Sequence, residues 1–164
     1  MSKRLPKFDI KRRLDDKVLV KLTPAEAKAN SLLDDQSGGS YDQESPYVSL
    51  KYFNDSFECF SHWEKDELKD FSDFLQQLRD RTWKDVLSTS GKTSKRGLAY
   101  TPYDIAKVSD GIRRCFDEVR KRISDDITFF ELRVNQNKLR VHGFRSKAAF
   151  FLVLLDREHR VWPM

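Results

Sequence analysis

The chain of 164 residues contains few cysteines, glycines and prolines and has no long apolar run. Its two cysteines, Cys59 and Cys115, lie in unrelated segments without metal-ligand spacing, so we expect reduced thiols rather than a disulfide or a zinc site. The longest apolar run, Ala148–Leu155, is much shorter than the roughly 20 residues that cross a bilayer. The basic segment Met1–Arg13 lacks the apolar stretch of a secretory signal. These absences predict a cytoplasmic protein without a membrane span.

Motifs of cofactor-dependent and metal-dependent enzymes are also missing. The segment Ser90-Gly91-Lys92-Thr93 is similar to the end of a phosphate-binding loop, but Val86 stands where that loop requires a second glycine. The adjacent pairs Asp34-Asp35 and Asp125-Asp126 point apart in an extended chain, so neither forms a paired-carboxylate site. There is no nucleophile elbow and no dinucleotide-binding glycine pattern. The sequence therefore predicts no metal and no cofactor.

The composition nevertheless supports one packed domain with an N-terminal extension. Hydrophobic residues make up 38% of the chain and phenylalanine occurs 12 times, so ring packing should dominate the core. Residues 1–46 read as an arm with a short helix after the capping box Thr23-Pro24-Ala25-Glu26, followed by a flexible connector from Asp34 to Pro46. Residues 47–164 are expected to form the core domain.

Two amphipathic helices are expected inside this core. The first follows a predicted strand at Tyr47–Phe53 and a capping box at Ser61–Glu64, and the second covers Ser109–Ile123 after a helix cap at Thr101–Asp104. Their apolar positions recur at steps of three and four residues: Leu68, Phe71, Phe74, Leu75 and Leu78 in the first, and Ile112, Cys115, Phe116, Val119 and Ile123 in the second.

The C-terminal part has the pattern of a three-stranded meander. Thr128–Val134 alternates in hydrophobicity, Lys138–Arg145 follows a short turn, and Ala148–Leu155 is nearly all apolar. Such a strand is buried on both faces and must be central or covered by a helix. The predicted fold class is α+β, with helices packed on a small antiparallel sheet formed mainly by this meander.

Basic side chains concentrate on one side of the middle strand. Lys138, Arg140 and His142 share that side, since side chains alternate along a strand. Arg133 from the preceding strand, together with His159 and Arg160, could converge on the same edge, although the strand register is not readable from sequence. Guanidinium groups stabilise a phosphate in its transition state, and a histidine can exchange protons with an attacking hydroxyl or a leaving oxygen.

These residues resemble the ending of RelE/ParE-type toxins. The similar segments are Leu132-Arg133-Val134, Arg140-Val141, the apolar strand, and His159-Arg160-Val161-Trp162. The resemblance covers roughly residues 130–164, together with the order of the helices that precede them. In that family two helices pack on a curved antiparallel sheet, and many members cut messenger RNA on the ribosome without a metal. This chain is longer, and Asp156-Arg157-Glu158 is inserted before His159.

The resemblance implies a metal-independent endoribonuclease acting on RNA, with ribosome-bound messenger RNA as substrate and an antitoxin-like protein as a further partner. Arg133 and Arg140 would hold the phosphate, and His159 or His142 would transfer the proton. Further basic residues are candidates for nucleic-acid binding: Lys92, Lys95, Arg96, Lys138, Arg145, Lys147, Arg157 and Arg160.

Two other functions are consistent with the same residues. In one, the basic sheet face binds nucleic acid or an acidic protein and no bond is broken, so that only Arg and Lys substitutions matter and affinity falls steeply with salt. In the other, the protein is an inhibitor or accessory factor of a mobile element whose N-terminal arm folds on a partner. The net charge of +5 favours an anionic partner only weakly.

Overall fold

The computed structural model describes residues 41–89 and 97–163. The helices of this part are α2 (Lys65–Arg79), α3 (Trp83–Ser88) and α4 (Asp110–Arg122), with short 3-10 turns η2 (Tyr41–Gln43), η3 (Phe60–His62) and η4 (Ile105–Lys107). The strands are β1 (Tyr47–Ser49), β2 (Thr101–Tyr103), β3 (Phe129–Arg133), β4 (Arg140–Ser146) and β5 (Ala149–Asp156).

The five strands form one mixed sheet in the order β1-β5-β4-β3-β2. The predicted meander is its centre, because β3 pairs antiparallel with β4 and β4 with β5. At one edge β1 lies parallel to β5, and at the other β2 is antiparallel to β3. The predicted α+β class is confirmed, while the parallel edge pair adds a feature that the sequence pattern did not contain.

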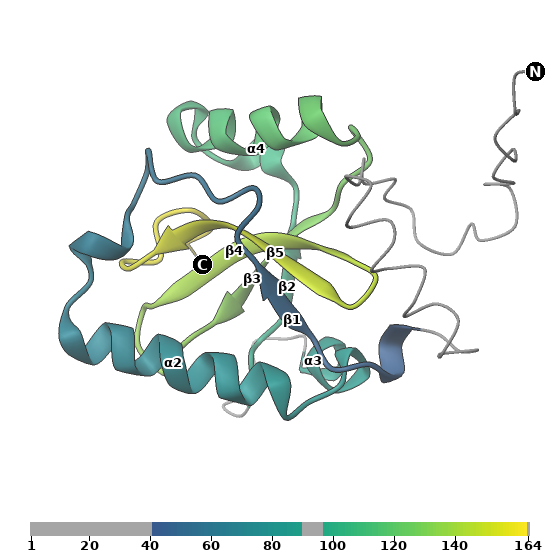
Figure 1. Cartoon of the computed structure of the whole chain (residues 1–164). Coiled ribbons are helices and arrows are strands. Elements are labelled where there is room, and N and C mark those ends of the chain that lie inside the picture. Colours follow the sequence, from purple (N-terminus) through teal and green to yellow (C-terminus); the bar gives the residue numbers. More distant parts are fainter. Residues whose placement is uncertain (1–40, 90–96, 164) are drawn as a thin grey trace, which may run out of the picture.

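Helices cover both faces of this sheet (Figure 1), with α4 on one side and α2 and α3 on the other. Each side has its own hydrophobic cluster: one contains Cys115, Phe116 and Val119 of α4, and the other contains Phe74 and Leu78 of α2 with Trp83 of α3. Strand β5 is buried along its whole length, as its apolar sequence predicts for a strand covered on both faces.

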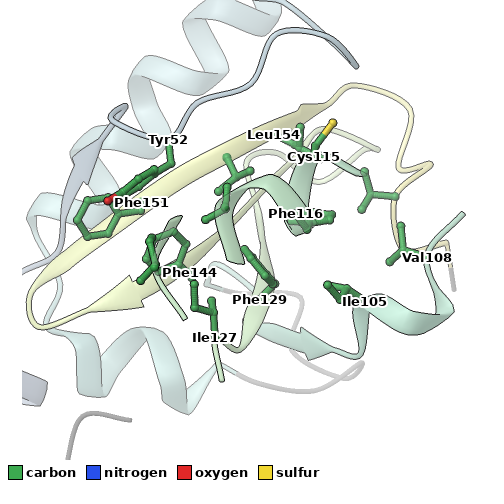
Figure 2. Close-up of a cluster of buried hydrophobic side chains, with 14 of the residues drawn as sticks. Tyr52, Ile105, Val108, Cys115, Phe116, Ile127, Phe129, Phe144, Phe151 and Leu154 are labelled. Carbon is green, nitrogen blue, oxygen red and sulfur yellow. The ribbon is translucent and has the colours of Figure 1, made fainter. Parts of the chain in front are cut away.

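Aromatic rings fill the cluster beneath α4 (Figure 2). Phe129, Phe144 and Phe151 come from three neighbouring strands, and Phe116 meets them from the helix. The Phe144 and Phe151 rings are stacked with centroids 4.9 Å apart, and those of Phe116 and Phe129 lie 4.7 Å apart. This ring packing helps to fix the register of the three central strands β3, β4 and β5.

Several local predictions differ from the structure. The helix cap expected at Thr101–Asp104 is correct only for its last residue, because the Asp104 carboxylate accepts the Ala106 N–H at 2.9 Å and caps η4. Thr101–Tyr103 form strand β2 instead, and the buried Tyr103 side chain packs into the α4-side cluster. The strand expected over Tyr47–Phe53 ends at Ser49. Helix α2 begins after Glu64, whose backbone N–H donates to the Glu67 carboxylate at 2.8 Å, because Ser61 lies in the preceding 3-10 turn.

Of the arm and connector predicted over residues 1–46, the structure describes only residues 41–46. Residues 41–46 contact the body, since Trp83 donates its backbone N–H to the carbonyl of Glu44 at 2.9 Å. The short helix predicted after Thr23 lies outside the described residues. Among the described helices, none combines the length and apolar character that a membrane span requires.

Candidate functional site

Two arginines lie side by side where strands β3 and β4 meet the turn that joins them. Arg133 and Arg140 are direct cross-strand partners in the register. Arg133 donates from Nη2 to the carbonyl of Gly97 at 3.1 Å. The sequence analysis suggested that Arg133 and Arg140 could lie at the same edge of the sheet. The strand register places them opposite each other, so both arginines lie at the same end of the β3–β4 pair.

The Arg140 guanidinium is fixed on one side by backbone carbonyls. Its Nη1 donates to Asn137 at 2.9 Å, to Leu139 at 3.0 Å and more weakly to Asn135 at 3.4 Å. Nε and Nη2 make no hydrogen bond to the described residues. Burial lowers the pKa of this guanidinium, the nearby Glu131 raises it, and Arg133 lowers it, so the charges of all three residues interact.

One step further along the same face lies a row of buried polar residues. Glu131 of β3 and His142 of β4 are cross-strand partners, with 4% and 0% of their surface exposed. The Tyr103 hydroxyl lies 2.9 Å from His142 Nδ1, and the Asp156 carboxylate lies 3.2 Å from His142 Nε2. His142 was predicted as a proton-transfer group, but its complete burial gives it no direct access to a substrate.

Asp156 connects this row to the segment that follows β5. Its Oδ1 accepts the backbone N–H of Arg160 and its Oδ2 accepts that of Val161, both at 2.8 Å. Burial raises the pKa of the Asp156 carboxyl, but hydrogen bonds from His142, Arg160 and Val161 outweigh it and leave this pKa below its ordinary value. Asp156 is therefore an ionised anchor for the backbone of residues 160–161.

The Tyr103 hydroxyl stays protonated, because burial, together with the charges of Glu131 and Asp156, raises its pKa well above the ordinary value. The phenol can therefore donate to His142 Nδ1. A neutral His142 then carries its proton on Nε2 and donates it to Asp156.

His159 reaches the site from this following segment. Its backbone has φ of 55°, a left-handed conformation that is uncommon for residues other than glycine and that clusters at functional sites. Its Nε2 lies 3.2 Å from Glu131 Oε2, and its side chain is 14% exposed. Nδ1 makes no hydrogen bond to the described residues, so it is the ring nitrogen that a substrate could use.

The predicted binding residues divide into two groups. Lys138, Arg157 and Arg160 surround the His159 segment: Lys138 pairs with Glu158 at 3.3 Å, Arg157 with Glu67 at 2.6 Å, and Arg160 lies over the Phe57 ring at 4.8 Å. Arg145 and Lys147 lie at the opposite end of β4, over the rings of Trp83 and Tyr41 respectively. Lys92, Lys95 and Arg96 lie outside the described residues.

Three residues of the buried row were not predicted as site residues: Tyr103, Glu131 and Asp156. Glu131 carries a sequence signal, because it alternates onto the same strand face as Arg133. Asp156 also carries one, as a charged residue that directly follows a continuous apolar strand. Tyr103 lies in the segment that was predicted as a helix cap, so its position opposite Phe129 was not apparent.

Within residues 41–89 and 97–163, no group of three or more His, Cys, Asp and Glu side chains is arranged to hold a metal ion. The candidate site is thus a pair of arginines beside a Glu131–His159 pair, supported by buried polar residues. Neither a protein-family model, nor a curated protein, nor a solved structure matches this chain.

Proposed function

We propose that the chain is a metal-independent endoribonuclease, the activity implied by its resemblance to RelE/ParE-type toxins. One observation carries the proposal: the His159 imidazole is held against the Glu131 carboxylate at 3.2 Å, on a face that also carries the Arg133–Arg140 pair. Two residues along a strand correspond to about 7 Å, so the phosphate-binding and proton-transferring groups lie within the reach of one nucleotide.

The proposed reaction uses His159 as the proton-transfer group. Nδ1 takes the proton of a ribose 2′-hydroxyl as its oxygen attacks the adjacent phosphorus, and the P–O5′ bond breaks. The imidazolium then returns the proton to the leaving 5′ oxygen. Glu131 stabilises the imidazolium between the two transfers, as a carboxylate partner does for a catalytic histidine. The products are a 2′,3′-cyclic phosphate and a 5′-hydroxyl end.

Arg140 supplies charge stabilisation in this proposal. Its Nη1 is bound to carbonyls, which fixes the plane of the guanidinium, while Nε and Nη2 remain for the oxygens of the scissile phosphate. Arg133 adds a second positive charge beside it. Preoriented donors of this kind are effective because they need no reorganisation during the reaction.

The order of elements supports the resemblance in part. Helices α2, α3 and α4 all precede the meander β3–β5, as the resemblance implies. They are divided between the two faces of the sheet in this chain (Figure 1), which leaves the end of the sheet around Arg133 and Arg140 as the proposed approach for RNA. Messenger RNA on the ribosome is the proposed substrate.

The test is RNA cleavage by the wild type and by His159→Gln, Glu131→Gln and Arg140→Lys. Free RNA is assayed in EDTA and ribosome-bound RNA in magnesium buffer, and the chemistry of the cut ends is mapped in both. We expect cyclic phosphate ends from the wild type and a loss of about 10²-fold or more in His159→Gln. The control is His62→Gln, an exposed histidine in η3. Equal cleavage by wild type and His159→Gln, with both proteins folded, would contradict the proposal.

A non-enzymatic nucleic-acid-binding module is the second candidate. Lys138 and Arg160 favour it, because their side chains are 69% and 56% exposed, whereas Arg140 is buried and Arg133 is only partly exposed. This candidate predicts salt-sensitive RNA binding without cut ends, unchanged in His159→Gln and weakened in Arg160→Gln. The same set of variants therefore separates the two functions.

A further inference from the structure

The buried polar row raises the question of why a tyrosine, a histidine and an aspartate are placed beneath a site that they do not contact directly. His142 and Asp156 are completely buried, and Tyr103 nearly so, among otherwise apolar neighbours. Burying such groups costs free energy unless each is hydrogen-bonded. Their hydrogen bonds form a single chain that ends in the backbone beside His159.

We propose that Tyr103, His142 and Asp156 are positioning residues that set the placement of the His159 imidazole against Glu131. This inference rests on the proposed function for its catalytic consequence, although the placement itself is a property of the free protein.

The first step of the argument is the backbone. His159 adopts φ of 55°, which disfavours a branched or bulky side chain and needs support from its surroundings. The support comes from Asp156, whose two oxygens accept the N–H groups of the two residues after His159. Asp156 therefore stabilises the turn at residues 157–161, and this turn directs the His159 imidazole toward Glu131 on β3.

The second step is the orientation of Asp156. The carboxylate receives a further hydrogen bond from His142 Nε2, and the Tyr103 hydroxyl on the opposite side of the ring selects that tautomer. The groups that face His142 are Tyr103 on β2, Glu131 on β3 and Asp156 on β5. A substitution at Tyr103 therefore affects the position of His159 only indirectly, by altering the hydrogen bonds of His142 and then of Asp156.

The third step is the second attachment of His159. Its Nε2 meets Glu131, the cross-strand partner of His142. The imidazole is thus held by its backbone from one side and by its ring from the other. A displacement of a reacting group by about 1 Å can lower activity by up to about 10²-fold, so groups that orient His159 should affect the rate strongly.

The experiment records the imidazole nitrogen spectra of the RNA-free protein. The chain has three histidines, so His62→Gln, His142→Gln and His159→Gln assign every signal. Tyr103→Phe is then compared with Tyr52→Phe, which removes the same hydroxyl from a buried tyrosine packed on Phe144 and Phe151. We expect the His159 signals to move in Tyr103→Phe and to stay unchanged in Tyr52→Phe.

Kinetics give the second readout. In Tyr103→Phe we expect kcat for RNA cleavage to fall about tenfold with KM nearly unchanged, the pattern of an interaction that matters in the transition state. His142→Gln, which keeps a donor toward Asp156, should retain more activity than His142→Ala. Unmoved His159 signals in both Tyr103→Phe and His142→Gln would overturn the inference. If the wild type cuts no RNA, the proposed function fails, and the spectra alone still decide the positioning role.

Discussion

At the scale of single residues, the buried polar groups around Asp156 form more hydrogen bonds, and are less exposed to solvent, than the charged pairs on the surface. The Asp156 carboxylate has three hydrogen-bond partners and no exposed surface. By contrast, Asp80 is paired with Arg79 at 3.1 Å while both side chains are about two-thirds exposed. Exposed pairs of that kind contribute little, whereas a buried group that loses its partner is strongly destabilising.

Asp156→Ala should therefore lower the free energy of unfolding by roughly 3–5 kcal/mol, because it leaves His142 and two backbone N–H groups without their acceptor. Urea unfolding followed by far-UV circular dichroism measures this change. Asp80→Ala is the matched control and should change stability by less than about 0.5 kcal/mol. Equal losses in the two variants would show that the buried carboxylate has no special role.

The same carboxylate makes stability depend on acid. Its pKa in the folded protein lies below the ordinary value of 3.8, so the unfolded chain binds the proton more readily than the folded one. The stabilisation is complete above that value and is lost as the pH falls through the lower, folded pKa. We expect the stability difference between wild type and Asp156→Asn to be largest near neutral pH and to shrink in acid. Parallel stability curves from pH 7 to pH 3 would disprove this linkage.

At the scale of elements, the pairing of β4 with β5 depends on one glycine. The register shifts between His142 and Gly143, and a Cβ at Gly143 would collide with the carbonyl of Phe151 and the ring of Phe150. The absence of a side chain at Gly143 therefore allows the β5 backbone to lie close to β4 directly beside His142. Backbone is harder to displace than a flexible side chain, so the close approach is a requirement of the sheet.

Gly143→Ala should destabilise the protein by about 3 kcal/mol, the upper end of the usual cost of overpacking, since backbone blocks relaxation. Gly111→Ala, in α4, has open space around the new methyl group and should stabilise by up to about 1 kcal/mol. Thermal unfolding of the two variants should shift the midpoint in opposite directions. A neutral Gly143→Ala would mean that β4 and β5 are not packed this closely.

The elements also show what the sequence could and could not predict. The meander and the two amphipathic helices were apparent because their periodicity is set by burial of one face. β2 was not, because the Thr-Pro-Tyr-Asp sequence of residues 101–104 also matches a helix start, and only pairing with β3 decides between them. β1 pairs parallel with a strand that is distant in sequence, which no local pattern specifies.

The candidate site was predictable to the same degree. The proximity of Arg133 and Arg140 follows once the meander is known, because a short turn fixes their register. The burial of His142 and the contact between His159 and Glu131 depend on how the segment after β5 folds back, and that path is set by Asp156. A sequence pattern identifies the residue types of such a site more readily than their exposure.

At the scale of the whole molecule, the net charge of +5 is modest, so the proposed binding of RNA depends on a few local cations. Arg160→Gln should reduce the slope of log affinity against log salt for single-stranded RNA by about 0.7, the value for one lost phosphate contact. Lys84→Gln, an exposed change in α3 on the other face of the sheet, should leave the slope unaltered. Fluorescence anisotropy across a salt series measures both, and identical slopes would remove Arg160 from the interface.

The parallel pairing of β1 with β5 has a consequence for synthesis of the protein. Tyr47 aligns with Ala149, so the first strand of the body finds its neighbour only after β5 has left the ribosome. Until β5 has emerged, α2 and α3 have no complete sheet to cover, and their apolar faces stay exposed. Chaperones that bind nascent chains should therefore associate with this protein until β5 has emerged from the ribosome.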